Sequence, residues 1–192
     1  MEEKEDLRVR RTKKLLSFAL LDIMEDTPFN KISVNDICEK AMVHRATFYN
    51  HFYDKEDLFN YILGEIQEEM FNKSIESGTF TSSKEMYMDL IVRVLNFISD
   101  NRQRITKIVN KNSYEKMLLL IAETIKRSIK YLLVKNKFKE EYTIPVDVLA
   151  NFFTGGLTVI GYNFLTDETK YTKEQILGFC DVLLNEQTYI KK

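Results

Sequence analysis

Apolar residues recur at helical spacing along almost the whole chain. Between residues 15 and 23 they stand at i, i+1, i+4, i+5 and i+8, which is the pattern of one buried helix face. No stretch shows a convincing alternation of apolar and polar residues, which is typical of a half-buried strand. Further helical patterns follow at about 33–41, 44–52, 54–74, 84–99, 102–110, 113–135, 145–165 and 173–188. The sequence therefore predicts an all-α protein of about nine helices.

Capping residues and one linker divide the chain into segments. Ser33 with Asp36, and Thr172 with Gln175, have the spacing of capping boxes, which begin helices. The clearest linker is SGTFTSS, at residues 77–83. We therefore expect three parts: a small helical module at 1–53, a connecting helix at 54–76 and a larger helical bundle at 77–192.

Two short predicted helices, 33–41 and 44–52, are joined by a connection of three or four residues, which is the layout of a helix-turn-helix unit. In the second helix, HRATFYNHF, Phe48 and Phe52 lie one turn apart on the face that we expect to pack. Arginine and asparagine suit the edges of guanine and adenine, and hydroxyl groups suit phosphates. The second helix is therefore predicted to read bases in the DNA major groove. Its side chains that point away from the packed face or flank it are Arg45, Ala46, Thr47, Tyr49 and Asn50.

The charge of the whole chain does not indicate a nucleic-acid partner, because the formal net charge is −1. A local signal is present instead. Together with Arg45 and Lys55, a basic run can form one positive face while the acidic residues lie elsewhere. That run has no acidic residue within it and consists of Arg8, Arg10, Arg11, Lys13 and Lys14.

The stretch SVNDICEKAMVHRATFYNHFYDKEDLF resembles the N-terminal DNA-binding domain of the TetR/AcrR family of transcriptional regulators. The resemblance covers about residues 8–72. It lies in a Ser-capped helix, a turn at Ala41–Val43 and the pattern T-[LF]-Y-x-[HY]-F-x-x-K-[ED]-x-L from Thr47 to Leu58. It implies that Thr47, Tyr49 and Lys55 contact phosphate or sugar, that positions 45, 46 and 50 read bases, and that His51 lies near the DNA backbone. The candidate DNA-binding residues are Ser33, His44, Arg45, Ala46, Thr47, Tyr49, Asn50, His51 and Lys55.

Two positions depart from the family pattern. Met42 stands where the family usually has glycine, and it carries strain if the turn needs a positive φ. His44 replaces the usual serine at the start of the recognition helix, so this helix is capped less well or the histidine itself meets DNA. Both departures bear on the turn geometry and on the DNA sequence that is preferred.

His44 and His51 are the two histidines of the chain, and a metal or acid–base site is the alternative interpretation. A spacing of seven residues puts them two turns apart, and no serine or cysteine nucleophile stands nearby. Cys38 and Cys180 match no metal spacing and are expected to be small buried residues in a reducing cytosol. We therefore expect no metal, no cofactor and no enzymatic activity.

The segment VLANFFTGGLTVIGYNFLT, residues 148–166, is long enough to cross a membrane and carries no charge. It contains two asparagines, three threonines and three glycines, and no basic cluster flanks it. We expect a helix buried in a core or a subunit interface. The charged N-terminus has no apolar region of a signal peptide, which also favours a cytoplasmic protein without a membrane partner. A phosphate-binding loop at Gly155-Gly156 is the alternative to a packing role for these two glycines, but no strand precedes it and no lysine follows it.

The resemblance also implies a homodimer, in which the last two helices, about 145–165 and 173–188, pair across a two-fold axis. Two recognition helices would then lie one DNA turn apart and bind a pseudo-palindromic, double-stranded operator. A strip of small residues within the first of these helices would let another helix approach closely. The strip consists of Ala150, Thr154, Thr158 and Gly161, at i, i+4, i+8 and i+11.

TetR-like proteins hold a small-molecule pocket within their C-terminal helices, so the resemblance implies a repressor that an unknown small-molecule effector releases. The candidates to line the pocket are Tyr87, Ile91, Leu95, Ile98, Met117, Ile121, Phe152 and Tyr162; each of them could instead fill the core. The GGL…YNFL segment also resembles TetR-like activators linked to dihydroxyacetone kinase, whose signal is a partner protein. Control by a partner protein is therefore the alternative.

Overall fold

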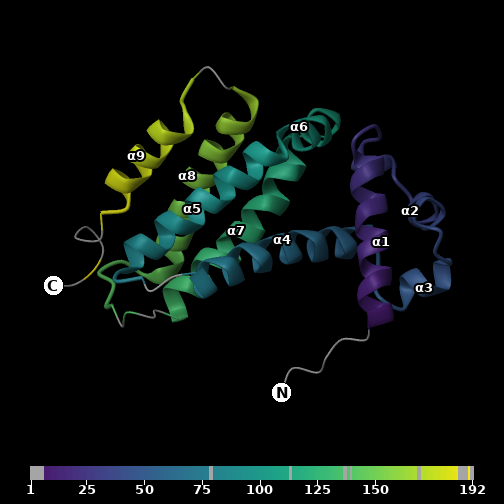
Figure 1. Cartoon of the computed structure of the whole chain (residues 1–192), viewed down its shortest axis with the longest axis horizontal. Coiled ribbons are helices and arrows are strands. Elements are labelled where there is room, and N and C mark those ends of the chain that lie inside the picture. The colour runs from purple at the N-terminus through teal and green to yellow at the C-terminus, as the bar shows by residue number, and fades with distance from the viewer. Residues whose placement is uncertain are drawn as a thin grey trace. The chain divides into compact units, whose positions relative to one another are not determined.

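The computed structural model describes residues 7–77, 80–112, 114–135, 138, 140–167, 170–185 and 190. This part of the chain forms nine α-helices and one 3-10 turn, and the all-α prediction is confirmed (Figure 1). Its one extended pairing is an isolated antiparallel bridge between Tyr142 and Ile190. The elements are α1 (Leu7–Met24), η1 (Phe29–Lys31), α2 (Val34–Ala41), α3 (Arg45–Tyr49), α4 (Lys55–Ser77), α5 (Ser83–Asp100), α6 (Arg102–Lys111), α7 (Tyr114–Lys135), α8 (Val146–Thr166) and α9 (Lys173–Leu183).

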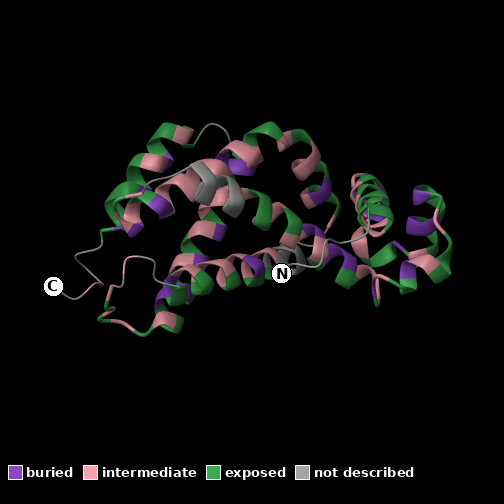
Figure 2. Cartoon of the chain, turned by 60° about the horizontal axis from the view of Figure 1, so that its bottom comes forward, coloured by how far each residue is buried: buried purple, intermediate pink, exposed green. Residues whose placement is uncertain are grey.

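The helices assemble into two compact units, one made of residues 1–65 and 107–117 and the other of residues 66–106 and 118–192. The predicted boundaries at 53 and 76 followed the ends of helices. The compact units divide α4 after residue 65 and α6 after residue 106, and the three-part division stays a prediction. Along the helices, buried residues alternate with exposed ones, as amphipathic sequences require (Figure 2).

In the first unit, α1 packs on α2 and α2 packs on α3. The core residues that lose all contact with water are Leu16, Leu20, Met24, Ile37, Phe48 and Leu58. Cys38 is buried among them as a free thiol, and burial raises its pKa, so it is a small core residue as predicted.

The end of α6 belongs to this first unit and is bonded to it at two points. The backbone N–H of Phe29 donates to Oδ1 of Asn112 at 2.6 Å. The ammonium of Lys107 lies 3.1 Å from a carboxylate oxygen of Glu25. The end of α1 and the η1 turn are thereby tied to a segment about 80 residues further along the chain.

The second unit has two apolar clusters. One is built around Leu95, Phe164, Ile176 and Cys180, where α5 packs on α8 and α9. The other contains Leu133, Leu149 and Ala150, from α7 and α8. Cys180 is also a free, buried thiol whose pKa is raised by burial.

Helix α8 is long and apolar enough to cross a membrane by length and composition, with a mean hydropathy of 1.3 over its best window. Its inner face, however, is part of the core of the second unit. The predicted small-residue strip lies on that inner face: Ala150, Thr154 and Thr158 are buried, and a Cβ on Gly161 would lie 3.7 Å from Ile98 of α5. At Gly161, the helix that lies close to this strip therefore comes from the same chain.

Candidate nucleic-acid interface

Helix α2 begins with the capping box that the sequence predicted. The hydroxyl of Ser33 accepts from the backbone N–H of Asp36 at 3.2 Å, and the carboxylate of Asp36 accepts from the Ser33 N–H at 2.8 Å. The backbone N–H and then the hydroxyl of Ser33 lower the pKa of Asp36. Ser33 is thus a structural residue at the start of α2, and its hydroxyl is already used within the chain.

The turn between α2 and α3 is left-handed at Met42, which has φ 53° and ψ 44°. This is the C-cap of α2: the Met42 N–H points to the carbonyls of Cys38 and Glu39, and the Val43 N–H donates to Cys38 at 2.9 Å. The turn does need a positive φ, which costs a residue with a Cβ about 1–2 kcal/mol. The Met42 side chain is 94% exposed and recovers none of this cost by packing.

Helix α3 spans five residues, Arg45–Tyr49, and is shorter than the predicted 44–52. Phe48 is 0% exposed and lies 5.8 Å, between ring centroids, from buried Phe52. The Phe52 ring in turn contacts Tyr61 of α4 at 5.3 Å. The predicted packing face is therefore present. The residues that α3 and its ends turn toward solvent are His44, Arg45, Ala46, Tyr49 and Asn50, with Thr47 and His51 half-buried.

Two of these outward side chains are held by one another. The guanidinium of Arg45 lies 5.9 Å from the Tyr49 ring centroid, and the Tyr49 ring meets the edge of Phe48 at 5.4 Å. A stacked arginine keeps its five N–H donors in one orientation. The structure therefore presents the Arg45 fork and the Tyr49 hydroxyl in a restricted arrangement before any ligand binds.

His44 occupies the N-cap of α3, with extended φ and ψ, and its side chain makes no capping hydrogen bond. The first turn of α3 is therefore capped less well than a serine would cap it. The His51 ring packs against Phe52 at 6.5 Å. Across the described residues, no group of three or more His, Cys, Asp and Glu side chains is placed to hold a metal ion.

Lys55 has a structural role that sequence reasoning did not show. Its ammonium donates to the carbonyl oxygens of Phe29 and Ile32, both at 2.7 Å, and lies 4.9 Å from the Phe29 ring centroid. An ammonium has three N–H donors, so one is left for a phosphate. Lys55 thus joins the start of α4 to the segment that leads into α2.

Tyr53 was missed by the sequence interpretation. It lies between α3 and α4, is 85% exposed, and its N–H donates to Asp57 at 3.0 Å. The hydrogen bond fixes the backbone at Tyr53, and the exposed side chain brings its hydroxyl group next to the recognition helix. The only sequence signal was its position inside the T-F-Y-N-H-F-x-x-K pattern, at a site where that pattern accepts any residue.

The predicted pocket residues whose side chains the structure describes lie in different parts of the second unit. Ile91, Leu95 and Ile98 belong to one apolar cluster, and Tyr87 belongs to the other. Ile121 and Tyr162 are half-buried, and the Met117 side chain lies outside the described part of the chain. Phe152 differs most from a buried lining residue. It is 72% exposed, because it stands half a helical turn from the buried Ala150 and Thr154.

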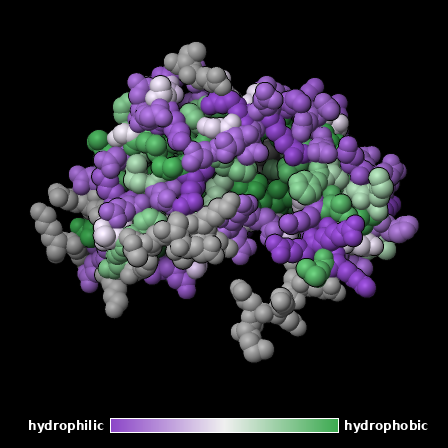
Figure 3. All heavy atoms as spheres, viewed as in Figure 1, coloured by the Kyte–Doolittle hydropathy of each residue, from purple (hydrophilic) through white to green (hydrophobic). Residues whose placement is uncertain are grey.

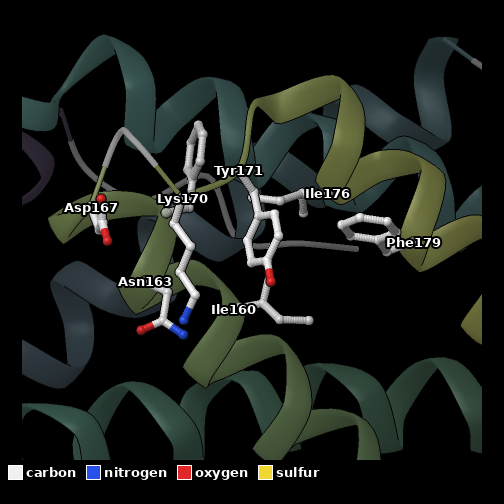
Figure 4. Close-up of a pocket in the computed structure, with 8 residues that line it drawn as sticks. Ile160, Asn163, Asp167, Lys170, Tyr171, Ile176 and Phe179 are labelled. Carbon is white, nitrogen blue, oxygen red and sulfur yellow. The ribbon is translucent and has the colours of Figure 1, made fainter.

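A small hollow of about 80 Å³ lies elsewhere, between the C-terminal half of α8 and the start of α9 (Figure 4). None of the eight predicted pocket residues is among the eight that line it. Sequence reasoning overlooked this place because the hollow is formed at a helix–helix connection, where periodicity gives no signal.

Comparisons with known proteins agree with this geometry. Residues 19–62 match the model of the family described as "Bacterial regulatory proteins, tetR family". The chain is 36% identical over 61 residues, 32% of this chain and 33% of the relative, to the HTH-type dhaKLM operon transcriptional activator DhaS of Lactococcus lactis. It is 41% identical over 58 residues, 30% of this chain, to the HTH-type transcriptional regulator YxbF of Bacillus subtilis, but this match covers only 15% of that relative.

A solved structure extends the likeness over the whole fold. Lin0861 from Listeria innocua superposes with a TM-score of 0.69, covering 95% of this chain and 94% of that one at 19% identity. At this identity the agreement shows the fold. The family model covers residues 19–62, the part of the chain that contains α2 and α3.

Proposed function

Because the chain belongs to the tetR family of bacterial regulatory proteins, we propose that it is a homodimeric, sequence-specific repressor that binds a pseudo-palindromic operator. The family consists of transcription regulators and not of enzymes. The proposal includes a cytoplasmic location, double-stranded DNA as partner and no cofactor.

The observation that carries DNA binding is the division of α3 into two faces. Phe48 is fully buried, whereas Arg45, Ala46, Tyr49 and Asn50 on the other side are exposed. Such an exposed row is suited to a major groove, with Arg45 and Asn50 directed to base edges and the hydroxyls of Tyr49 and Thr47 to phosphates. Lys55 supplies its third N–H to a phosphate, and the exposed Tyr53 adds a further hydroxyl.

Exposed apolar residues on the last two helices support the homodimer. On α8 they lie on the face that points away from the core, and on α9 they lie in the C-terminal half of the helix. Figure 3 likewise shows hydrophobic residues reaching the surface among hydrophilic ones. Burying such residues against the same residues of a second copy is a common basis of two-fold interfaces. The exposed apolar residues are Val148, Phe152 and Val159 of α8 with Phe179, Val182 and Leu183 of α9.

The proposed interface can be tested by introducing charge. We expect Phe152→Glu and Val182→Glu to give monomers in sedimentation equilibrium, whereas Tyr131→Glu on α7 leaves the dimer intact. Retention of a wild-type dimer by both interface variants would show that another surface is used.

Regulation is proposed to work through α4 and α6, because the N-terminal unit holds the beginning of α4 and the end of α6. An effector shifts the spacing of the two recognition helices only if it binds the released state more tightly than the DNA-bound state. A small molecule bound among the C-terminal helices is the proposed effector.

Control by a partner protein is the second candidate. The relative DhaS is named as an operon activator, and α7 exposes Leu119, Tyr131 and Val134, a surface that another protein could cover. The two candidates differ in what releases the protein from its operator. Release by a low-molecular-weight fraction of the cell supports the small molecule, and release that needs a macromolecular fraction supports the partner.

The deciding experiment is selection of bound DNA from a random pool. We expect an inverted repeat whose half-site centres lie one helical turn, about 10 base pairs, or a multiple of it apart. Tyr49→Ala should weaken binding to all sequences alike, whereas Arg45→Ala should relax the preference at one position of each half-site by about 1–3 kcal/mol. Tyr131→Ala is the matched control. A pool without an enriched sequence would overturn the proposed function.

A further inference from the structure

Four aromatic side chains of the first unit form a continuous series of ring contacts that joins the recognition helix to α4. Tyr49 meets Phe48 edge-on, with the ring centroids 5.4 Å apart, and Phe48 lies 5.8 Å from Phe52. The Phe52 ring lies 5.3 Å from that of Tyr61, in α4. We call these four residues the aromatic row. Its two inner rings, Phe48 and Phe52, are buried, and its two end rings are partly exposed.

A cation lies over the ring at each end of the aromatic row. At one end, the guanidinium of Arg45 lies 5.9 Å from the Tyr49 ring centroid. At the other end, the ammonium of Lys13, in α1, lies 5.1 Å from the Tyr61 ring centroid. A cation over the face of a ring is attracted by the electrons of that ring, so this contact needs no carboxylate. The aromatic row therefore holds two positive charges without neutralising either of them.

The start of α1 and the recognition helix α3 lie at the same end of the first unit (Figure 1). Lys13 belongs to the basic run at 8–14, which has no acidic residue within it. Its side chain is half-buried beside α4, whereas Arg10, about one turn earlier on the same side of α1, is exposed. Helix α1 thus adds positive charge at the end of the unit that holds α3.

We propose that Lys13 is a further DNA-binding residue, which donates to a backbone phosphate beside the groove that α3 enters, and that Tyr61 positions it. This inference rests on the proposed function, because it requires α3 to bind in the major groove. Arg45, at one end of the aromatic row, then reads a base, and Lys13, at the other end, neutralises a phosphate. An ammonium is suited to this role, since it binds a phosphate as a point charge.

Tyr61 has two contacts that make it a positioning residue. Its ring packs on Phe52, which supports the recognition helix through Phe48. The same ring holds the ammonium of Lys13. A lysine side chain loses conformational entropy when it binds a phosphate, and a side chain already held over a ring loses less. The separation between the phosphate contact and the base contact is therefore set before DNA binds.

The slope of log affinity against log salt measures the proposed phosphate contact. Affinity is measured for the full chain on the duplex enriched from the random pool and on a shuffled duplex of the same length. We expect Lys13→Met to lower the slope by about one for each half-site that is bound. The slope should fall on both duplexes, because a phosphate contact carries no sequence information. A wild-type slope in Lys13→Met would overturn the proposal.

Lys135→Met is the matched control. Lys135 lies over the Tyr131 ring at 5.7 Å, which is the same kind of contact, but in the second unit. Both changes remove one positive charge from a lysine that lies over a tyrosine ring. We expect Lys135→Met to keep the wild-type slope. Equal decreases for Lys13→Met and Lys135→Met would show an effect of net charge and would refute a direct contact of Lys13.

Two replacements of Tyr61 separate positioning from packing. Tyr61→Phe keeps the ring and should keep the wild-type slope. Tyr61→Leu removes the ring and should lower the slope as Lys13→Met does, with no further decrease in the double variant. A role in packing alone would lower the free energy of unfolding in urea and leave the slope unchanged, because the folded fraction still makes every phosphate contact. That result would refute the positioning role.

Failure of this inference can be told apart from failure of the proposed function. A wild-type protein that binds both duplexes equally would refute sequence-specific binding, and the contact of Lys13 would still be measured on either duplex. A preference for the enriched duplex, together with an unchanged slope in Lys13→Met, would leave the proposed function intact and refute the contact of Lys13 alone. Binding to neither duplex would refute both.

Discussion

Asn112 accepts a hydrogen bond of 2.6 Å from the backbone N–H of Phe29, a residue 83 positions earlier in the chain. The amide N–H of Asn112 donates to the carbonyl of Ile108 at the same time, so this side chain both ends α6 and holds the η1 turn. The ring of Phe29 contacts that of Phe59 of α4 in a tilted arrangement, with the centroids 5.5 Å apart, and the Phe29 carbonyl oxygen accepts a hydrogen bond from Lys55. One backbone unit therefore connects α6, α4 and the segment before α2.

Replacement of Asn112 tests this connection. Asn112→Ala leaves the part-buried Phe29 N–H without its acceptor, and we expect a loss of about 1–3 kcal/mol in the free energy of unfolding. Asn101→Ala is the control, because Asn101 likewise donates to the carbonyl four residues back, Phe97, at the end of α5. Urea unfolding followed by circular dichroism should show a clearly larger loss for Asn112→Ala, and equal losses would contradict the role of the Phe29 contact.

Lys55→Met should affect folding and DNA binding separately. Two charged hydrogen bonds to carbonyl oxygens disappear, which we expect to cost about 2–4 kcal/mol of stability. The remaining N–H predicts, in addition, that the slope of log affinity against log salt falls by about one. Lys40→Met, which removes a longer and exposed 3.9 Å pair with Asp22, is the control for stability. Wild-type stability of Lys55→Met would show that the carbonyl contacts contribute nothing.

Met42→Gly should stabilise the protein by about 1 kcal/mol, because glycine adopts the left-handed conformation without the Cβ penalty. Little burial is lost, since the Met42 side chain is exposed. Met42→Ala provides the comparison: it removes the same side chain but keeps the Cβ, and its stability should stay near the wild type. Thermal unfolding of the three proteins measures the difference, and a glycine variant no more stable than the alanine variant would refute the strain.

Ser33→Ala tests the capping box through the titration of Asp36. The backbone N–H and the hydroxyl of Ser33 both lower the pKa of this carboxylate. A folded-state pKa below the unfolded value stabilises the fold above the unfolded pKa, and this contribution is lost as pH falls through the folded pKa. Alanine keeps the backbone donor, so the pKa should rise only part of the way. Carbon-13 titration of the Asp36 carboxyl measures it, with Glu85, which has its own cap at Thr81 and Ser82, as an unchanged reference.

The sequence predicted the helices well, because their apolar spacing, caps and breaks are local properties. The capping boxes at Ser33 and Thr172 were found at the predicted residues, and Phe48 and Phe52 are the packed face of the recognition helix. The exposure of Arg45, Tyr49 and Asn50 follows from the same periodicity. Features that depend on a sequence motif or on the helical period of 3.6 residues could therefore be predicted from the sequence alone.

Contacts between distant residues could not be predicted in this way. The pairing of Lys55 with carbonyls at positions 29 and 32, and that of Asn112 with Phe29, depends on where separate elements meet. The small-residue strip of α8 was predicted to let another helix approach closely, but its spacing could not show which helix. Gly161 lies beside Ile98 of α5, whereas Ala150 belongs to the cluster with Leu133 of α7. The bulky Phe152 is left outside.

Gly155 and Gly156 stand on the outer face of α8, where an added Cβ would meet no described atom within 4 Å. Each glycine costs the isolated helix about 1 kcal/mol relative to alanine, and nothing in the described part of the same chain repays it. In the proposed dimer, contact with the second subunit offsets this cost. The melting temperature should then rise with protein concentration. A newly made chain would reach its full stability only after it pairs with another. The amount of the protein in the cell would therefore set the fraction that is able to bind DNA.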